Sequence, residues 1–94
     1  MTHQKIMSAS PDEFFRSLSH LRPEQVFDKS ARQFELALME GTALISFKKL
    51  PDRQVTGLLA LPQLEVSIAF EHVPPADQDD FLKEFDLAFR RGGG

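Results

Sequence analysis

The spacing of the apolar residues changes twice along this chain of 94 residues, and the change limits the folds open to it. Between residues 10 and 21, and again between residues 75 and 91, large apolar side chains recur every three or four positions, which is the period of an amphipathic helix. Between residues 33 and 71 they recur at every second position, the period of a half-buried strand. The pattern predicts strands enclosed by two helices, in an α+β domain.

The first helix has a well-defined start and end in the sequence. Ser10 can cap the first turn, Pro11 suits the first helical position, and Glu13 completes a capping box. The residue before Pro23 is disfavoured in helical geometry, so the helix is expected to end near Leu21. Residues 1–9 are polar and aperiodic, and we expect them to form a flexible N-terminal arm.

Two hairpins are predicted in the alternating segment. The first turns at residues 40–41 and pairs Leu38 with Ala43; the second turns at residues 62–63, and residues 51–53 form the loop between them. In both hairpins, parity places apolar residues opposite apolar residues on one face. The expected architecture is a two-layer α-β-β-β-β-α domain over residues 10–92, a four-stranded antiparallel meander with both helices packed on one face.

Eight of the nine phenylalanines are interpreted as core residues. These eight fall at helix or strand positions that face the space between the two layers, and Phe27 lies in a connection. Burying one aromatic side chain contributes about 2–3 kcal/mol, so the set accounts for much of the core. The eight are Phe14, Phe15, Phe34, Phe47, Phe70, Phe81, Phe85 and Phe89.

Charge and cysteine content narrow the functional classes. The formal net charge is −3, whereas nonspecific binding to nucleic acid needs a surplus of Lys and Arg. The predicted open sheet face also has no aromatic ring on which bases could stack, so the sequence argues against nucleic acid as a partner. The absence of cysteine excludes disulfides and thiolate sites, and no apolar run is long enough to cross a membrane. We expect a soluble, cytoplasmic protein.

The sequence shows no catalytic, cofactor-binding or metal-binding constellation. The acidic residues Asp77, Asp79 and Asp80 fit a solvated first helical turn and lack the ligand spacing of a calcium loop. The three histidines are scattered without metal-ligand spacing, and the serines lie in no triad or nucleophile-elbow context. We expect a protein that is not an enzyme and that holds no cofactor or metal.

The predicted open face of the sheet is the strongest functional candidate. Such a face is normally polar, but here its middle is expected to expose small apolar side chains within a charged rim. Apolar patches with polar rims usually mark interaction surfaces. The candidate interaction face consists of Ala37, Met39, Leu44, Leu58, Ala60 and Ala69.

Three interpretations of this face stay open. It could contact another protein or a second copy of the chain in a homodimer, it could hold a small-molecule ligand in a shallow cup, or it could be too modest for either. A small positive cluster in the loop between the hairpins is a candidate anchor for an acidic partner or an anionic ligand, unless it is simply a solvated loop. The cluster consists of Lys48, Lys49 and Arg53.

The terminal glycines also allow two interpretations. A Gly-Gly tail is the reactive end of ubiquitin-like modifiers and sulfur carriers, but glycine also ends helices in the left-handed conformation. A strong helical pattern precedes these glycines, whereas a ubiquitin-like order places a strand there. We therefore interpret Gly92 as the end of a helix and residues 93–94 as frayed, with conjugation chemistry as the alternative.

Overall fold

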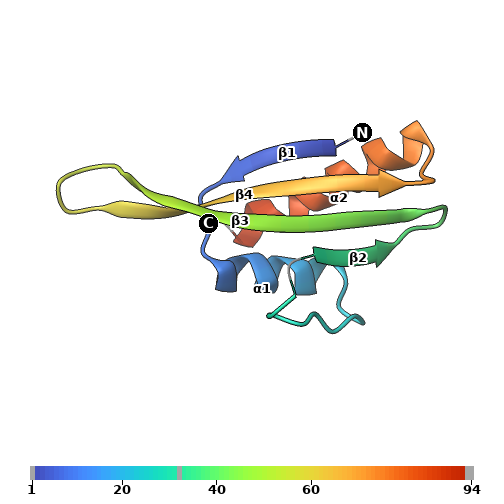
Figure 1. Cartoon of the computed structure of the whole chain (residues 1–94), viewed down its shortest axis with the longest axis horizontal. Helices are drawn as coiled ribbons and strands as arrows, with labels where there is room; N and C mark the ends of the chain where they lie inside the picture. Colours follow the sequence, from blue (N-terminus) through green and yellow to red (C-terminus); the bar gives the residue numbers. More distant parts are fainter. Residues whose placement is uncertain (1, 32, 93–94) are drawn as a thin grey trace.

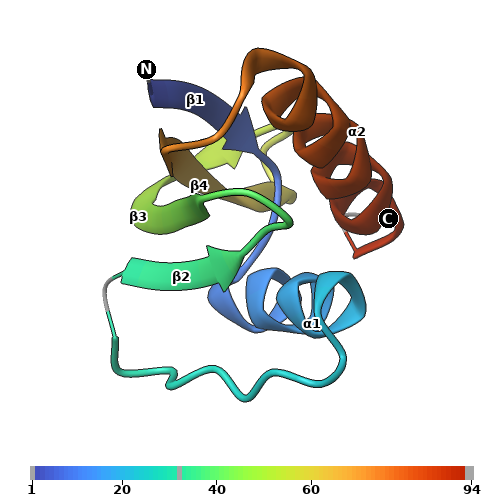
Figure 2. The ribbon, with the colours of Figure 1, turned by 90° about the vertical axis from the view of Figure 1, so that its right-hand side faces the viewer.

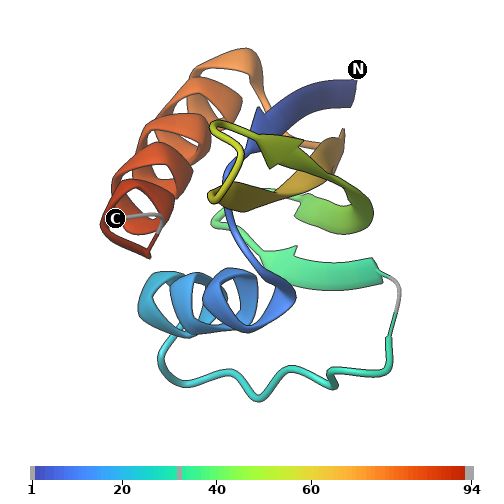
Figure 3. The same cartoon turned by 90° about the vertical axis from the view of Figure 1, so that its left-hand side faces the viewer.

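The computed structural model describes residues 2–31 and 33–92, which form one antiparallel sheet and two helices (Figure 1). The elements are β1 (Thr2–Met7), α1 (Pro11–Leu21), β2 (Gln33–Ala37), β3 (Thr42–Gln54), β4 (Ala60–Glu71) and α2 (Pro75–Gly92). The strand order is β1-β4-β3-β2, and each neighbouring pair is antiparallel. Both helices lie on one face of the sheet, as the two end-on views show (Figure 2 and Figure 3). The predicted α+β class and four-stranded antiparallel sheet are confirmed.

The order of the elements differs from the prediction because the N-terminal segment is a strand. Residues 2–7, expected to be part of a flexible arm, pair with residues 64–69 of β4 and form an edge of the sheet. The observed order is therefore β-α-β-β-β-α instead of α-β-β-β-β-α. The pattern of β1 is weak because this edge strand is stabilised by backbone pairing with β4 and not by a row of apolar side chains. Lys5 lies on its inner face and directs its ammonium to the partly exposed carboxylate of Asp86.

The second predicted hairpin is also corrected. Residues 60–71 form the single strand β4, and the chain reverses at residues 55–59, where the Val55 amide donates to the Leu59 carbonyl over 2.9 Å. Residues 51–53, expected to form a loop, lie within β3 at a bulge that shifts the register between Leu50 and Arg53. Pro62 lies opposite this bulge, where the ladder does not need the N–H that proline lacks.

The first hairpin lies where it was predicted, but its register differs by two residues. Ala43 is paired with Leu36 instead of Leu38, and residues 38–41 form the connection. A shift of two positions leaves every side chain on its predicted face, because side chains alternate with a period of two. Gly41 occupies a left-handed conformation in this connection, with φ of 83°.

The core forms between the sheet and the helices. The capping box at Ser10 is present as predicted, and α1 ends at Leu21. Phe14 is fully buried against Phe47 and Phe89, with ring centroids 4.7 and 5.3 Å apart. The eight phenylalanines assigned to the core are buried or packed against the buried cluster, as predicted, and Phe27 also packs against it. Helix α2 extends to Gly92, and the predicted fraying at residues 93–94 lies outside the described residues.

Candidate functional site

The two central strands extend well beyond their neighbours at one end. Strand β2 pairs only with residues 42–46 of β3, and β1 pairs only with residues 64–69 of β4. Residues 50–63 therefore form a two-stranded projection, which we call the β3–β4 arm. The arm stands clear of the helices (Figure 1), and the molecule measures 47 Å along its longest axis against 25 and 22 Å along the others.

The arm is exposed and apolar at the same time. Every residue from 51 to 60 is exposed, Leu58 is fully so, and the side chains of Val55 and Leu59 are each 49% exposed. An isolated two-stranded hairpin is marginally stable in water, and clustered exposed apolar residues usually mark a contact surface. The apolar residues of the arm are Leu50, Val55, Leu58, Leu59, Ala60 and Leu61, together with its two prolines.

Most of the arm's large apolar residues share one face. In the β3–β4 register, Leu50 lies opposite Gln63 and Arg53 lies opposite Leu61. Because alternate residues of a strand share a face, Leu61 lies on the same side as Gln63, which is the side that continues the open face of the sheet. Val55 and Leu59 close the arm next to this row. The arm therefore extends the open face of the sheet with a more apolar surface.

A hydrogen-bonded turn presents Leu58 at the tip. The Leu59 amide donates to the Thr56 carbonyl over 3.4 Å, and the Thr56 hydroxyl accepts from the Leu58 amide over 3.2 Å. Gln54 reaches over the same turn and donates from its side-chain amide to the Thr56 carbonyl. These bonds satisfy the backbone locally and leave the Leu58 side chain in solvent.

The backbone edges of the arm are protected against strand addition. Pro51 and Pro62 donate no hydrogen bond, and the bulge between Leu50 and Arg53 interrupts the ladder. Proline, charged side chains and bulges are the features by which proteins prevent edge strands from pairing with other chains. The arm is therefore suited to contacts through its side chains, and poorly suited to extending another sheet.

The structure divides the predicted interaction face. Leu44 and Ala69 are cross-strand partners on the open face, and Ala37 lies at the end of β2 beside Thr42. The other three predicted residues lie outside this area: Met39 is in the β2–β3 connection, Leu58 is at the tip of the arm, and Ala60 is at the start of β4 on the opposite face. The division follows from the second hairpin, which turns at residues 55–59 and moves Leu58 and Ala60 away from the body.

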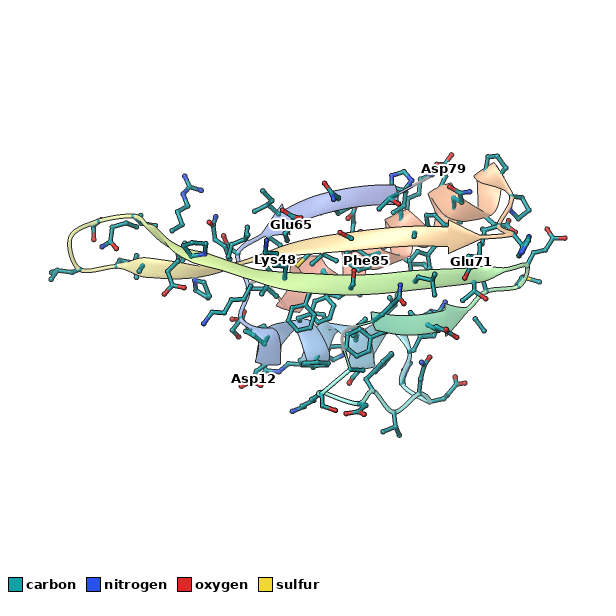
Figure 4. All side chains as sticks on the ribbon, viewed as in Figure 1. Asp12, Lys48, Glu65, Glu71, Asp79 and Phe85 are labelled. Atoms are coloured by element: carbon teal, nitrogen blue, oxygen red, sulfur yellow. The ribbon has the colours of Figure 1, made fainter. Side chains whose placement is uncertain are left out.

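The middle of the open face is polar. A row of side chains crosses all four strands there, with Gln4 on β1, Ser67 on β4, Ser46 on β3 and Gln33 on β2 in register. The neighbouring row places Glu65 beside Lys48 where the arm leaves the body (Figure 4). This face is therefore less apolar than its sequence pattern indicated.

The predicted positive cluster surrounds the base of the arm. Lys48 and Lys49 are consecutive in β3 and point to opposite faces of the sheet, whereas Arg53 follows the bulge on the side of Leu61. The three cations do not form the single loop anchor that was predicted. They place positive charge on both faces of the sheet at the base of the arm, with Glu65 beside Lys48 on the open face.

A cavity of about 390 Å³ lies at the opposite end of the molecule, near the β2–β3 connection and the start of α2. Its apolar lining includes Leu38, Met39 and Phe81, and the guanidinium of Arg22 lies 5.8 Å from the centre of the Phe81 ring. Three carboxylates on one face of α2 border it, from Asp77, Asp80 and Glu84. The acidic residues at the start of α2 thus take part in a concave surface, which the sequence pattern did not indicate.

The described part of the chain contains no group of three or more side chains suited to hold a metal ion, and no helix in it is long and apolar enough to span a membrane. His3 packs edge-on against the ring of Phe70, with centroids 5.8 Å apart. Comparison with protein-family models, curated proteins and solved structures found no match to this chain.

The arm is the feature that sequence reasoning missed. The segment from Val55 to Leu61 is apolar on both faces, a pattern that predicts a strand buried on both sides. Two features of the sequence argue against such a buried strand: Gly57 interrupts this segment, and Pro62 is poorly suited to the favoured two-residue turns. Together they are consistent with a turn near Gly57 and a proline within the following strand.

Proposed function

We propose that this protein is a non-catalytic protein–protein interaction module whose contact element is the β3–β4 arm. The observation that carries the proposal is that, among the described residues, no side chain of the arm belongs to the hydrophobic core. The apolar residues of the arm therefore do not stabilise the packing between sheet and helices. Contact with a partner gives these side chains a physical role.

The energetics support a contact through this surface. Removing one exposed leucine side chain from water contributes about 1.5–3 kcal/mol, and Leu58, Leu59 and Val55 lie within five consecutive residues. Several such side chains covered together can offset the entropy lost on association. The hydrogen bond from the Leu58 amide to the Thr56 hydroxyl holds the backbone of the tip in place, so the backbone loses less freedom on association.

The small-ligand alternative has less support. It relied on an apolar cup in the middle of the open face, where the row from Gln4 to Gln33 is polar. The cavity of about 390 Å³ is lined mainly by α2 and the β2–β3 connection, away from this row. Side-chain contact by the arm is therefore favoured over ligand binding on the sheet.

The test is photo-crosslinking in the native cells, with a photoreactive phenylalanine analogue at position 58. The control carries the analogue at Val26, which is also apolar and is 94% exposed, compared with full exposure for Leu58. We expect discrete adducts of protein size from position 58 that are absent from position 26. Equal adduct patterns from both positions, or no adduct from position 58, would contradict the proposal.

A stability measurement accompanies this test. Replacing Leu58 with Asn is expected to change the free energy of unfolding by no more than about 0.5 kcal/mol, because the side chain packs against nothing in the fold. The same replacement should abolish the adducts formed through a second photoreactive position at Val55. A large loss of stability would instead show that Leu58 serves the fold.

A further inference from the structure

Resting on the proposed function, we infer that the partner is a second copy of this chain, and that the arm of each copy docks into the acidic cavity of the other. The arm and the cavity lie at opposite ends of the same long axis. The two surfaces complement each other in shape, in polarity and in charge.

The shapes are complementary because one surface projects and the other is concave. The tip of the arm presents Leu58 on a narrow turn, and the cavity of about 390 Å³ has room for leucine side chains. Its lining includes the ring of Phe81 and the side chain of Met39, which is fully exposed in the single chain. Methionine adapts its shape to apolar partners, so Met39 can close over an inserted leucine.

The charges of the two surfaces are opposite. The arm and its base, residues 48–65, carry three basic side chains and two carboxylates, Asp52 and Glu65, so this part of the molecule is net positive although the whole chain has a formal net charge of −3. The cavity is bordered by Asp77, Asp80 and Glu84, and Arg22 is the only cation among the described residues that line it. Arg53 lies on the apolar side of the arm, where it can approach these carboxylates when the tip is inserted.

The lengthwise separation of the two surfaces allows a closed dimer. When two copies lie antiparallel and side by side, the arm of each reaches the cavity end of the other, so both contacts form at once. The second contact then forms within the complex and adds to the affinity. Copies that point in the same direction would make a single arm-to-cavity contact with each neighbour and form an open chain. The twofold arrangement avoids this.

The test is sedimentation velocity of the full chain between about 1 and 100 μM, at low and at high salt. We expect a dimer that dissociates more readily at high salt. Leu58→Glu in the arm and Glu84→Lys at the cavity should each weaken dimerisation at least tenfold, because each places a charge or reverses one at the contact. Glu24→Lys makes the same charge change at an exposed residue outside the cavity lining and should leave dimerisation unchanged.

Mixing the Leu58→Glu and Glu84→Lys variants provides the most specific test. A Leu58→Glu chain retains an intact cavity and a Glu84→Lys chain retains an intact arm, so an equimolar mixture should form mixed dimers that neither variant forms alone. A monomeric wild-type chain at 100 μM, or a Glu84→Lys variant that dimerises like the wild type, would overturn the inference. Adducts of position 58 with a different protein would also overturn it, while leaving the proposed interaction function supported.

Discussion

Lys5 and Asp86 are 81 residues apart in the sequence, yet their side chains form an ion pair that connects β1 to α2. The ammonium of Lys5 also lies 5.8 Å from the centre of the Phe85 ring. The pair is partly exposed, with 32% and 49% of the two side chains accessible, so its own contribution to stability is small. Its structural meaning is that the N-terminal segment has a defined position against the last helix.

We predict that alternate backbone amides of β1 are protected from hydrogen exchange, because they are paired with β4 along residues 64–69. Exchange followed by NMR would measure this directly. In the same experiment, Lys5→Ala should lower the free energy of unfolding by less than about 1 kcal/mol. Exchange of residues 2–7 at the rates of an unstructured peptide would instead show that this segment is a flexible arm.

A second prediction contrasts two glycines. At Gly41 an added β-carbon would lie 2.3 Å from the Glu71 carbonyl oxygen, which is too close, and the φ of 83° is unfavourable for any residue with a side chain. Gly41→Ala should therefore lower the free energy of unfolding by about 1–3 kcal/mol. Gly57 is the control, since a β-carbon there would meet no heavy atom within 4 Å. Gly57→Ala should be neutral or stabilise the fold by up to about 1 kcal/mol. Urea denaturation would measure both, and equal effects would contradict the structure.

The third prediction concerns the aromatic core. Phe14 is fully buried among rings from both layers, so Phe14→Ala should cost about 3–5 kcal/mol of folding free energy. Leu87→Ala is the matched control on α2, where the side chain is 61% exposed and a change within about 0.5 kcal/mol is expected. Thermal and chemical unfolding would measure the free energy of unfolding of both variants. A change at Phe14 as small as that at Leu87 would contradict the burial of Phe14 in the core.

The fourth prediction concerns the segment between α1 and β2. The hydroxyl and the amide of Ser30 both donate to the Asp28 carboxylate, and these bonds lower the pKa of Asp28 below its ordinary value of 3.8. A carboxyl group whose pKa is lower in the folded state stabilises the fold above its unfolded pKa, and this contribution disappears as the pH falls through the lowered value. An NMR titration should show a low midpoint for Asp28 that Ser30→Ala raises. A midpoint unaffected by that replacement would contradict the observed turn.

The sequence by itself determined the local elements and the faces of the body. The capping box at Ser10, the helical spacing of the phenylalanines and the alternation from residue 33 onward were sufficient to predict both helices, the first hairpin and the buried faces of the strands in the body. The predicted register of the first hairpin was wrong by two residues, but it still placed Leu36 and Ala43 on the buried face. Periodicity is a local property, so it is visible without knowledge of the partner.

The tertiary structure alone decided which segments pair and where the strands end. Nothing local in residues 2–7 indicates that they pair with β4, because an edge strand depends on a neighbour that here lies 57 to 67 positions away. The apolar segment around Leu58 has the pattern of a buried strand, and only the short reach of β1 and β2 leaves it exposed. The candidate contact surface therefore could not be predicted from periodicity, because exposure depends on which other elements cover a segment.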